Sequence, residues 1–164
     1  MTAWIVMAGR GSCYADQFTA YGMALFDYHE LGDVSNEKDR TSMARRFTYM
    51  RREQDQKLIT AGAAKKYAAE LWKIMHEVGE GDVLYVPMSG SKNYLLGRVT
   101  GPYAYRNDFP LEHRHAIAVT WARPFDALDI EEPLRSQVRG TQWTIREAPD
   151  QDSALTFADR QMNL

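Results

Sequence analysis

Cys13, His113 and His115 are the side chains of this sequence best suited to catalysis. Cys13 follows Gly-Arg-Gly-Ser at residues 9–12 and precedes an expected helix, a position that can activate a thiol. His113 and His115 alternate, so on a strand both would face the same side. A hydrolase built on Cys13 or on this pair is one hypothesis. However, no residue pattern nominates the base and the orienting partner that a nucleophile needs.

Metal and cofactor motifs are missing from the sequence. Two histidines do not complete a metal site, and neither HExxH nor CxxC occurs. The glycine-rich residues 9–12 match neither GxGxxG nor GxxxxGK[ST]. We therefore expect no metal and no cofactor, and a non-catalytic protein is the favoured interpretation.

The aromatic residues suggest a different chemistry, the binding of a planar base. The chain has nine Tyr, six Phe and four Trp. A ring beside polar groups can stack on a base while those groups read its edge. Six rings fall at expected strand ends or in loops: Tyr14, Tyr28, Tyr94, Tyr103, Tyr105 and Trp121. The alternative for each is a ring that covers the core and sends its polar atom to solvent.

Hydrophobic patterns predict the elements that would position these residues. Strands are expected at 3–8, 24–28, 83–88, 94–100, 115–122 and 141–146. Helices are expected at 14–23, at 35–50 with Ser35 as N-cap, at 55–78 and at 126–137. Helices thus come early and strands mostly late. This order predicts an α+β fold with a small curved sheet or β-barrel flanked by helices.

Length and composition restrict the organisation and the compartment. The length of 164 residues predicts one domain over 1–148, followed by a polar, frayed tail over 149–164. A single Cys excludes a disulfide framework and indicates a reducing, cytoplasmic setting. No apolar run is long enough for a transmembrane helix, so no membrane partner is expected.

Charge is distributed unevenly along the chain. The net charge of −2 gives no global support for nucleic-acid binding. Residues 36–66, however, hold nine Lys and Arg against four Asp and Glu. This basic helical segment is expected either to contact phosphate or to form a solvated surface with local ion pairs.

Several short motifs occur in a characteristic order. They are WIVMAGRG at 4–11, LGDVS at 31–35, GDVL at 81–84, YLLGRVTG at 94–101, YAYR at 103–106 and VTW at 119–121. With this order the chain resembles the N-terminal modules of Mrr-type restriction proteins, which are similar to EVE and YTH domains of the PUA-like group. The resemblance covers about residues 3–146.

The resemblance implies a curved β-barrel that reads modified nucleic acid. Domains of this group hold a modified base, flipped out of its strand, in an aromatic cage. The expected ligand is methylated cytosine or adenine, with DNA favoured and RNA as the alternative. The expected partner is a nuclease or motor domain or subunit of a defence system.

The resemblance also implies where the site lies. The pocket would use the end of the first strand, the aromatic Tyr28 as a stacking wall, and the turn after the third strand, with Ser89 and Ser91 as edge readers. We expect Tyr28 to be replaceable without loss of the fold, and the third wall to be Tyr103, Tyr105 or Trp121. The base-binding residues are then Met7, Gly9, Arg10, Tyr14, Tyr28, Met88, Ser89, Ser91, Tyr103 and Trp121. The phosphate-binding residues are Lys92, Arg106, His113 and Arg114, joined by Arg10.

A sensor of a small molecule or nucleotide derivative, using the same pocket, is the alternative from another class. Such a sensor would bind a free ligand with little dependence on salt. Nucleic-acid binding instead weakens steeply as salt rises, because phosphate contacts release counterions.

Overall fold

The apolar run at the start of the chain forms strand β1 (Ala3–Val6), whose four residues are all buried. β1 pairs in parallel with β3 (Val83–Pro87) and antiparallel with β7 (Ile145–Glu147). A strand covered on both faces has apolar residues at successive positions instead of an alternating pattern. The continuous run in the sequence is therefore the consequence of a central place in the sheet.

The computed structural model describes residues 1–28, 31–52, 55–90, 92–140 and 143–163. Their seven strands form one mixed sheet in the order β2-β5-β4-β3-β1-β7, with β6 (Phe125–Asp126) paired to β4. β2 (Met23–Phe26) and β7 stand at the two ends of this order, so the sheet is not closed. The expected α+β class is confirmed, whereas closure into a barrel is not seen in the described residues.

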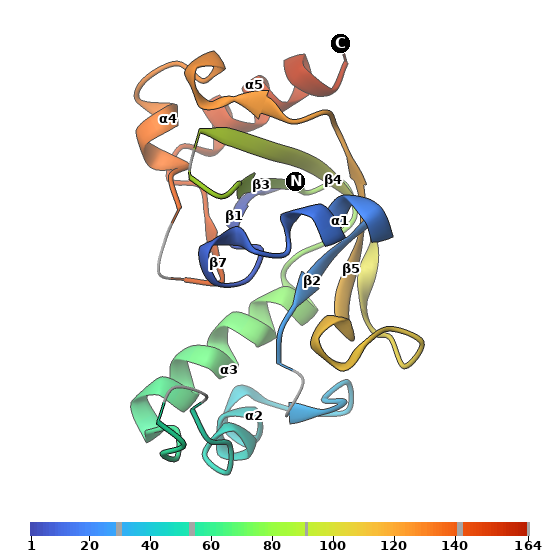
Figure 1. Ribbon diagram of the computed structural model, residues 1–164, viewed down its shortest axis with the longest axis vertical. Helices are drawn as coiled ribbons and strands as arrows, with labels where there is room; N and C mark the ends of the chain where they lie inside the picture. Colours follow the sequence, from blue (N-terminus) through green and yellow to red (C-terminus); the bar gives the residue numbers. More distant parts are fainter. Residues whose placement is uncertain (29–30, 53–54, 91, 141–142, 164) are drawn as a thin grey trace.

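Strand β4 (Asn93–Tyr105) extends beyond the expected 94–100 and lies between β3 and β5 in the sheet. Its residues 94–98 pair with β3, and its residues 97–99 and 103–105 pair with β5 (His115–Trp121). The register with β5 shifts between Val99 and Tyr103, where Gly101 and Pro102 interrupt the ladder. Such an irregularity bends a sheet, and Figure 1 shows the sheet strongly curved.

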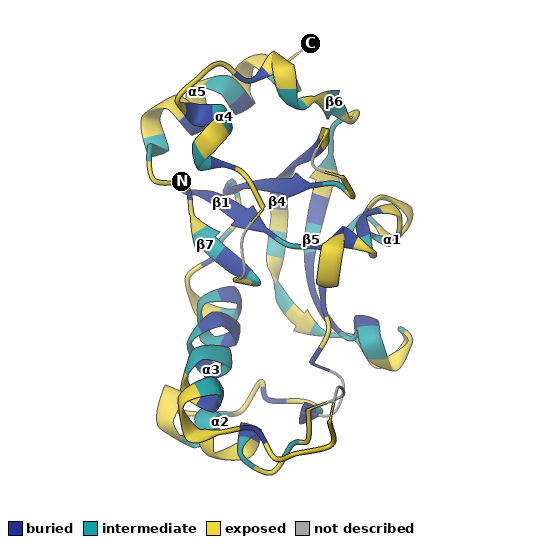
Figure 2. Ribbon diagram, turned by 60° about the vertical axis from the view of Figure 1, so that its left-hand side comes forward, coloured by how far each residue is buried: buried dark blue, intermediate teal, exposed yellow. Residues whose placement is uncertain are grey.

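Helices cover both faces of the sheet and form two hydrophobic clusters. One cluster lies under α1 (Ala15–Tyr21), α2 (Arg40–Phe47) and α3 (Ala61–His76) and includes Trp4 and Val6. The other lies under α4 (Leu134–Gln137) and α5 (Gln151–Met162) and includes Ala3 and Ile5. Helices α4 and α5 occupy one end of the long axis and α2 and α3 the other, with α1 beside the strands between them (Figure 1), and these strands are largely buried (Figure 2).

The starts of α2 and α3 differ from the sequence-based expectation. Ser35 does not cap a helix, because its N–H and hydroxyl both bond to Asp33 in a local turn. Asp39 caps α2 instead, accepting from the Ser42 N–H at 2.7 Å. Thr60 caps α3, so residues 55–60 precede this helix rather than belonging to it. The expected helix at 126–137 is a 3₁₀ turn (Ala127–Asp129) followed by the short α4.

The polar end of the chain is helix α5, and the expectation of a frayed tail was wrong. Asp150 caps the helix, and Ala154 and Ala158 are buried against the sheet. The Gln151 side chain accepts from the Ala3 N–H at 2.7 Å and donates to the Ala3 carbonyl at 3.0 Å. Ala154 and Ala158 give this helix only a narrow apolar face, which the sequence pattern does not reveal. The small side chains nevertheless allow the helix to pack closely on the sheet. Among the described helices, none has the length and apolar character required to cross a membrane.

Asp82 connects the start of β1 to the end of α3. Its carboxylate is buried and accepts from the Thr2 N–H at 2.7 Å, from Trp4 Nε1–H at 2.8 Å and from the Gly79 N–H at 3.0 Å. The Val99 N–H also donates to the Asp82 backbone carbonyl at 2.8 Å. This residue therefore fixes β1 relative to β3 before β1 reaches its C-terminal end.

We predict that Asp82→Ala lowers the free energy of unfolding by about 2–4 kcal/mol, because buried donors lose a charged acceptor. Urea denaturation measures this loss. Asp108→Ala is the matched control, since its carboxylate is exposed and pairs with Arg106 at the surface. The control should lose less than about 1 kcal/mol. Equal losses in both variants would show that Asp82 does not hold these elements together.

Candidate functional site

A cavity of about 770 Å³ lies where β1 and β2 end and β7 begins. The Met7 N–H donates to the Thr144 carbonyl at 2.9 Å, which joins the ends of β1 and the segment before β7. Loops that follow strands of a rigid sheet are common sites of binding residues. We call this space the aromatic cavity. Its lining residues are Met7, Gly9, Arg10, Gly11, Cys13, Tyr14, Leu25, Phe26, Asp27, Tyr28, Tyr67, Trp143 and Thr144.

Five of the residues expected to bind a base meet in this cavity. They are Met7, Gly9, Arg10, Tyr14 and Tyr28. They come from two segments that are distant in sequence and are brought together by the order of the sheet. The predicted pocket at the ends of the first two strands therefore corresponds to a real hollow in the structure.

Gly9 allows the loop after β1 to approach Tyr14. Its backbone has φ 73°, a conformation that favours glycine. A Cβ atom at this position would lie 2.4 Å from Cδ2 of the Tyr14 ring. The Tyr14 N–H donates to the Ala8 carbonyl at 2.8 Å. The glycine thus sets the position of one aromatic wall.

Tyr28 belongs to the core as well as to the cavity wall. It is 9% exposed, and its ring meets Phe47 and His115 edge to face, with centroids 5.8 and 5.9 Å away. Burial, with a smaller contribution from the negative charge of Glu70, raises the pKa of the hydroxyl. The expectation that Tyr28 could be removed without affecting the fold is therefore wrong, since a buried aromatic ring contributes strongly to stability.

Trp143 and Tyr67 also line the cavity, and neither was predicted from the sequence as a site residue. Trp143 is 47% exposed, and the Lys66 ammonium lies 4.2 Å from the centre of its ring. Tyr67 is half-buried on α3, and its ring contacts that of Phe47. A single Trp in the polar segment before β7 was the available indication, whereas Tyr67 belongs to the apolar stripe of α3 and looks like an ordinary core residue.

Polar groups surround the aromatic walls. Arg10 is exposed at the edge of the cavity, and the Tyr14 hydroxyl donates weakly to Asp27 at 3.4 Å. Burial, followed by the negative charge of Asp27, raises the pKa of Tyr14. Behind Thr144 lies the buried Glu70, whose Oε1 accepts from the Thr144 N–H at 3.2 Å. Burial raises the pKa of this carboxyl.

The other expected base-binding residues that the structure describes do not line the aromatic cavity. Met88 packs against the core and Ser89 is exposed in the turn after β3, while Ser91 lies outside the described residues. Trp121 stacks on Phe18 and lies so close to Gly97 that a Cβ there would be 2.4 Å from the indole ring. Tyr103 is bound to the core through its hydroxyl, 2.8 Å from His115 Nδ1. Tyr105, the remaining candidate for the third wall, meets His115 edge to face at 5.0 Å. None of the three candidates lines the aromatic cavity.

The expected phosphate-binding residues are also dispersed. Arg106 forms a bidentate pair with Asp108 at 2.8 and 2.7 Å, and Arg114 donates to the Phe109 carbonyl at 3.1 Å. His113 is 5% exposed and meets Tyr14 edge to face at 5.0 Å, so it supports a cavity wall and is not presented to a phosphate. Lys92 is exposed at the rim of a second cavity.

The residues considered for catalysis are separated as well. Cys13 is exposed and lines the aromatic cavity, but neither His113 nor His115 does. His115 is fully buried beside Tyr103 and Tyr28. Within the described residues, no group of three or more His, Cys, Asp and Glu side chains could hold a metal ion.

We predict that His115 makes the protein less stable in mild acid. Burial lowers its pKa to about 4, against weaker opposing effects of a backbone contact with Tyr28 and of Asp33 and Asp27. In the unfolded chain the His115 imidazole takes up a proton near pH 6.5, whereas in the folded protein it does so only near pH 4. The contribution of His115 to the free energy of unfolding is therefore fully present above pH 6.5 and is lost as the pH falls from 6.5 to 4. The loss reaches at most about 3 kcal/mol.

Urea denaturation at a series of pH values checks this prediction. His115→Gln should show a smaller loss between pH 6.5 and 4 than the wild type. His76→Gln, at an exposed position of α3, should retain the wild-type dependence. Identical pH profiles for His115→Gln and the wild type would contradict the prediction.

Comparison with known proteins gives one match. The model of the family described as "Domain of unknown function (DUF8426)" matches residues 4–148. No curated protein and no solved structure matches the chain. The matched segment runs from the second residue of β1 to beyond the end of β7 and includes every described residue that lines the aromatic cavity. The chain therefore belongs to the DUF8426 family.

Proposed function

We propose that this protein is a non-catalytic reader of modified nucleic acid and that the aromatic cavity is its base pocket. DNA with a methylated cytosine or adenine is the favoured ligand. A base flipped from its strand would enter between the rings, while the sugar and phosphates would stay outside near Arg10.

The observation that carries this proposal is the convergence of five aromatic residues on one cavity. Tyr14, Phe26, Tyr28, Tyr67 and Trp143 come from the residue before α1, β2, the segment after β2, α3 and the segment before β7. The volume of about 770 Å³ lies within the range of about 300–1,000 Å³ that is usual for small-ligand sites. Rings supplied by separate segments can face a planar group from several sides.

The energies involved are consistent with this function. Flipping a base costs a few kcal/mol, and each aromatic ring that stacks on a base contributes about 1–3 kcal/mol. Stacking therefore offsets the cost of flipping, and a phosphate contact from Arg10 would make binding net favourable. A buried methyl group adds about 0.8 kcal/mol, so a modified base would gain a modest preference from transfer alone.

The wider context is part of the same proposal. The resemblance to EVE and YTH domains of the PUA-like group implies a curved β structure flanked by helices, and the curved, unclosed sheet is compatible with it. A nuclease or motor domain of a defence system, in the cytoplasm, is the partner that the resemblance implies. The basic segment 36–66 supplies part of a phosphate-facing surface, although Arg40, Arg46 and Arg52 are paired with Glu77, Glu37 and Asp55.

We predict that Trp143→Ala weakens binding of a methylated oligonucleotide about tenfold, because the bound base loses one of the rings on which it stacks. Half of the Trp143 side chain is already exposed, so the unfolding midpoint should change little. Fluorescence anisotropy with single strands and duplexes that carry 5-methylcytosine, N6-methyladenine or no modification measures the effect. Leu111→Ala removes another exposed apolar side chain, 53% accessible and outside both the cavity and the basic segment, and is the matched control.

Two outcomes would overturn the reader function. Equal affinity of wild type and Trp143→Ala for the preferred strand would show that the aromatic cavity does not hold the base. Saturable binding of a free nucleoside with no dependence on salt, and none of any oligonucleotide, would instead favour the small-molecule sensor.

A further inference from the structure

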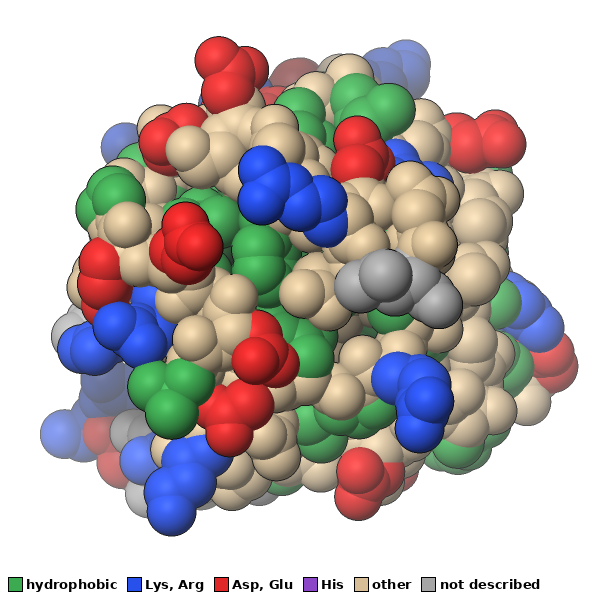
Figure 3. Space-filling model, turned by 90° about the horizontal axis from the view of Figure 1, so that it is seen from above, with side chains coloured by type: hydrophobic (Ala, Val, Ile, Leu, Met, Phe, Trp, Pro, Cys, Tyr) green, Lys and Arg blue, Asp and Glu red, His purple; other side chains and the backbone are tan. Residues whose placement is uncertain are grey.

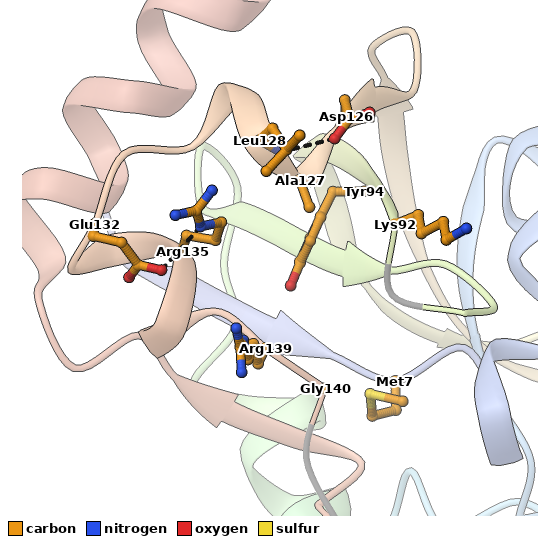
Figure 4. Close-up of a pocket in the computed structure, with 10 residues that line it drawn as sticks. All are labelled: Met7, Lys92, Tyr94, Asp126, Ala127, Leu128, Glu132, Arg135, Arg139 and Gly140. Carbon is orange, nitrogen blue, oxygen red and sulfur yellow. Dashed lines mark hydrogen bonds and ion pairs between the residues drawn. The ribbon is translucent and has the colours of Figure 1, made fainter.

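A second cavity, of about 930 Å³, adjoins the first through Met7, which lines both. It lies between the start of β4 and the segment from β6 to α4 (Figure 4). We call it the Tyr94–Arg139 cavity, after the two residues that decide its chemistry. Its other walls include Lys92, Leu128 and the backbone at Gly140.

Arg139 is an uncompensated positive charge in this cavity. It is exposed and forms no ion pair or side-chain hydrogen bond with any described residue. The neighbouring Arg135 is neutralised by Glu132, with Nε and Oε1 2.9 Å apart. The Asp126 carboxylate is likewise engaged, since it accepts from the Leu128 N–H at 2.8 Å in a helix cap. The carboxylates of the cavity are therefore occupied, whereas Arg139 is available to a ligand.

Tyr94 supplies a hydrogen-bond donor next to Arg139. Its side chain is 1% exposed and stacks on Phe125, with centroids 6.1 Å apart. The hydroxyl end points into the cavity toward Arg139 (Figure 4) and has no hydrogen-bond partner among the described residues. Burial raises the pKa of this hydroxyl, with a smaller opposing effect of Arg139, so it remains a donor at neutral pH. A guanidinium and a rigid hydroxyl side by side suit a phosphate oxygen.

The remaining lining suits the rest of a nucleotide better than a bare anion. Met7, Ala127 and the 75% exposed Leu128 are apolar, and the volume greatly exceeds that of a phosphate group. Figure 3 looks onto the end of the molecule that carries α4 and α5 and shows acidic and basic side chains interspersed. Anion recognition here therefore depends on a local pair of groups and not on a broad positive field.

We infer that the Tyr94–Arg139 cavity binds the nucleotide adjacent to the base in the aromatic cavity, with Arg139 and the Tyr94 hydroxyl on its phosphate. This inference rests on the proposed reader function and adds a second subsite to it. Arg139 lies four residues before Trp143, and Met7 separates the two cavities, so one strand can occupy both. Lys92, at the opposite rim, faces away from this pair in Figure 4 and lies where the strand would continue.

The test compares ligands of different length on single-site variants. The probes are 5-methyldeoxycytidine and N6-methyldeoxyadenosine, their 5′-monophosphates, and trinucleotides with the same base in the middle. Arg139→Gln should weaken trinucleotide binding about tenfold and leave nucleoside binding unchanged. It should also reduce the slope of log affinity against log salt by about 0.7. Tyr94→Phe keeps the stacking on Phe125 and should weaken trinucleotide binding in the same direction by a smaller factor.

The control and the outcomes separate this inference from the reader function itself. Arg123→Gln removes an exposed charge that lines neither cavity and should leave all affinities unchanged. Unchanged trinucleotide affinity in Arg139→Gln, with loss in Trp143→Ala, would overturn the second subsite and leave the reader function standing. If Arg139→Gln weakened the binding of the 5′-monophosphates but not of the trinucleotides, the cavity would be assigned to a small anionic ligand and the inference would be overturned. Failure of every trinucleotide to bind the wild type would overturn both.

Discussion

The buried carboxylate of Asp82 is the interaction on which the rest of the molecule depends. It accepts from the first residues of β1, from the indole of Trp4 and from the turn after α3, and thereby sets the register of β1 against β3. A buried charge is stabilising only when several donors surround it, and here three donors come from two separate segments, the start of the chain and the turn after α3. Met7, Gly9 and Arg10 reach the aromatic cavity because the strand that precedes them is held in this way.

The two cavities are formed by segments that meet only in the folded chain. Loop 9–12 is tied to the end of β3 by the Ser12 hydroxyl, which donates to the Pro87 carbonyl, and to the segment before β7 by Met7 and Thr144. The strands of the sheet therefore fix the short loops whose side chains line the cavities. His113 supports one wall from behind through its contact with Tyr14, while Tyr28 is itself a wall that is fixed by its contact with Phe47 in the core.

Local patterns predicted the fold better than they predicted the site. The apolar runs at 3–8, 24–28, 83–88 and 115–122 are strands, and Gly22 ends α1 with φ 63°, because these features depend on neighbouring residues. The start of α2 was misplaced because Asp39 caps it instead of Ser35, and the start of α3 was placed too early because Thr60 caps that helix. Met7, Gly9, Arg10, Tyr14 and Tyr28 were correctly expected to lie together. Trp143 was missed because a long-range pairing of β7 with β1 places it, and Trp121 was misplaced because Gly97 opens a position for its ring in the core.

The place of β1 in the sheet has a consequence for synthesis of the protein. β1 is the first strand to be made, yet its partners β3 and β7 begin at residues 83 and 145. Until the last of these has been translated, a wholly apolar strand retains an unpaired edge, which invites association with other chains. Contacts of such long sequence separation also slow folding, because the chain must close a long loop before it gains them. This apolar strand therefore stays incompletely paired until residues 145–147 have been made.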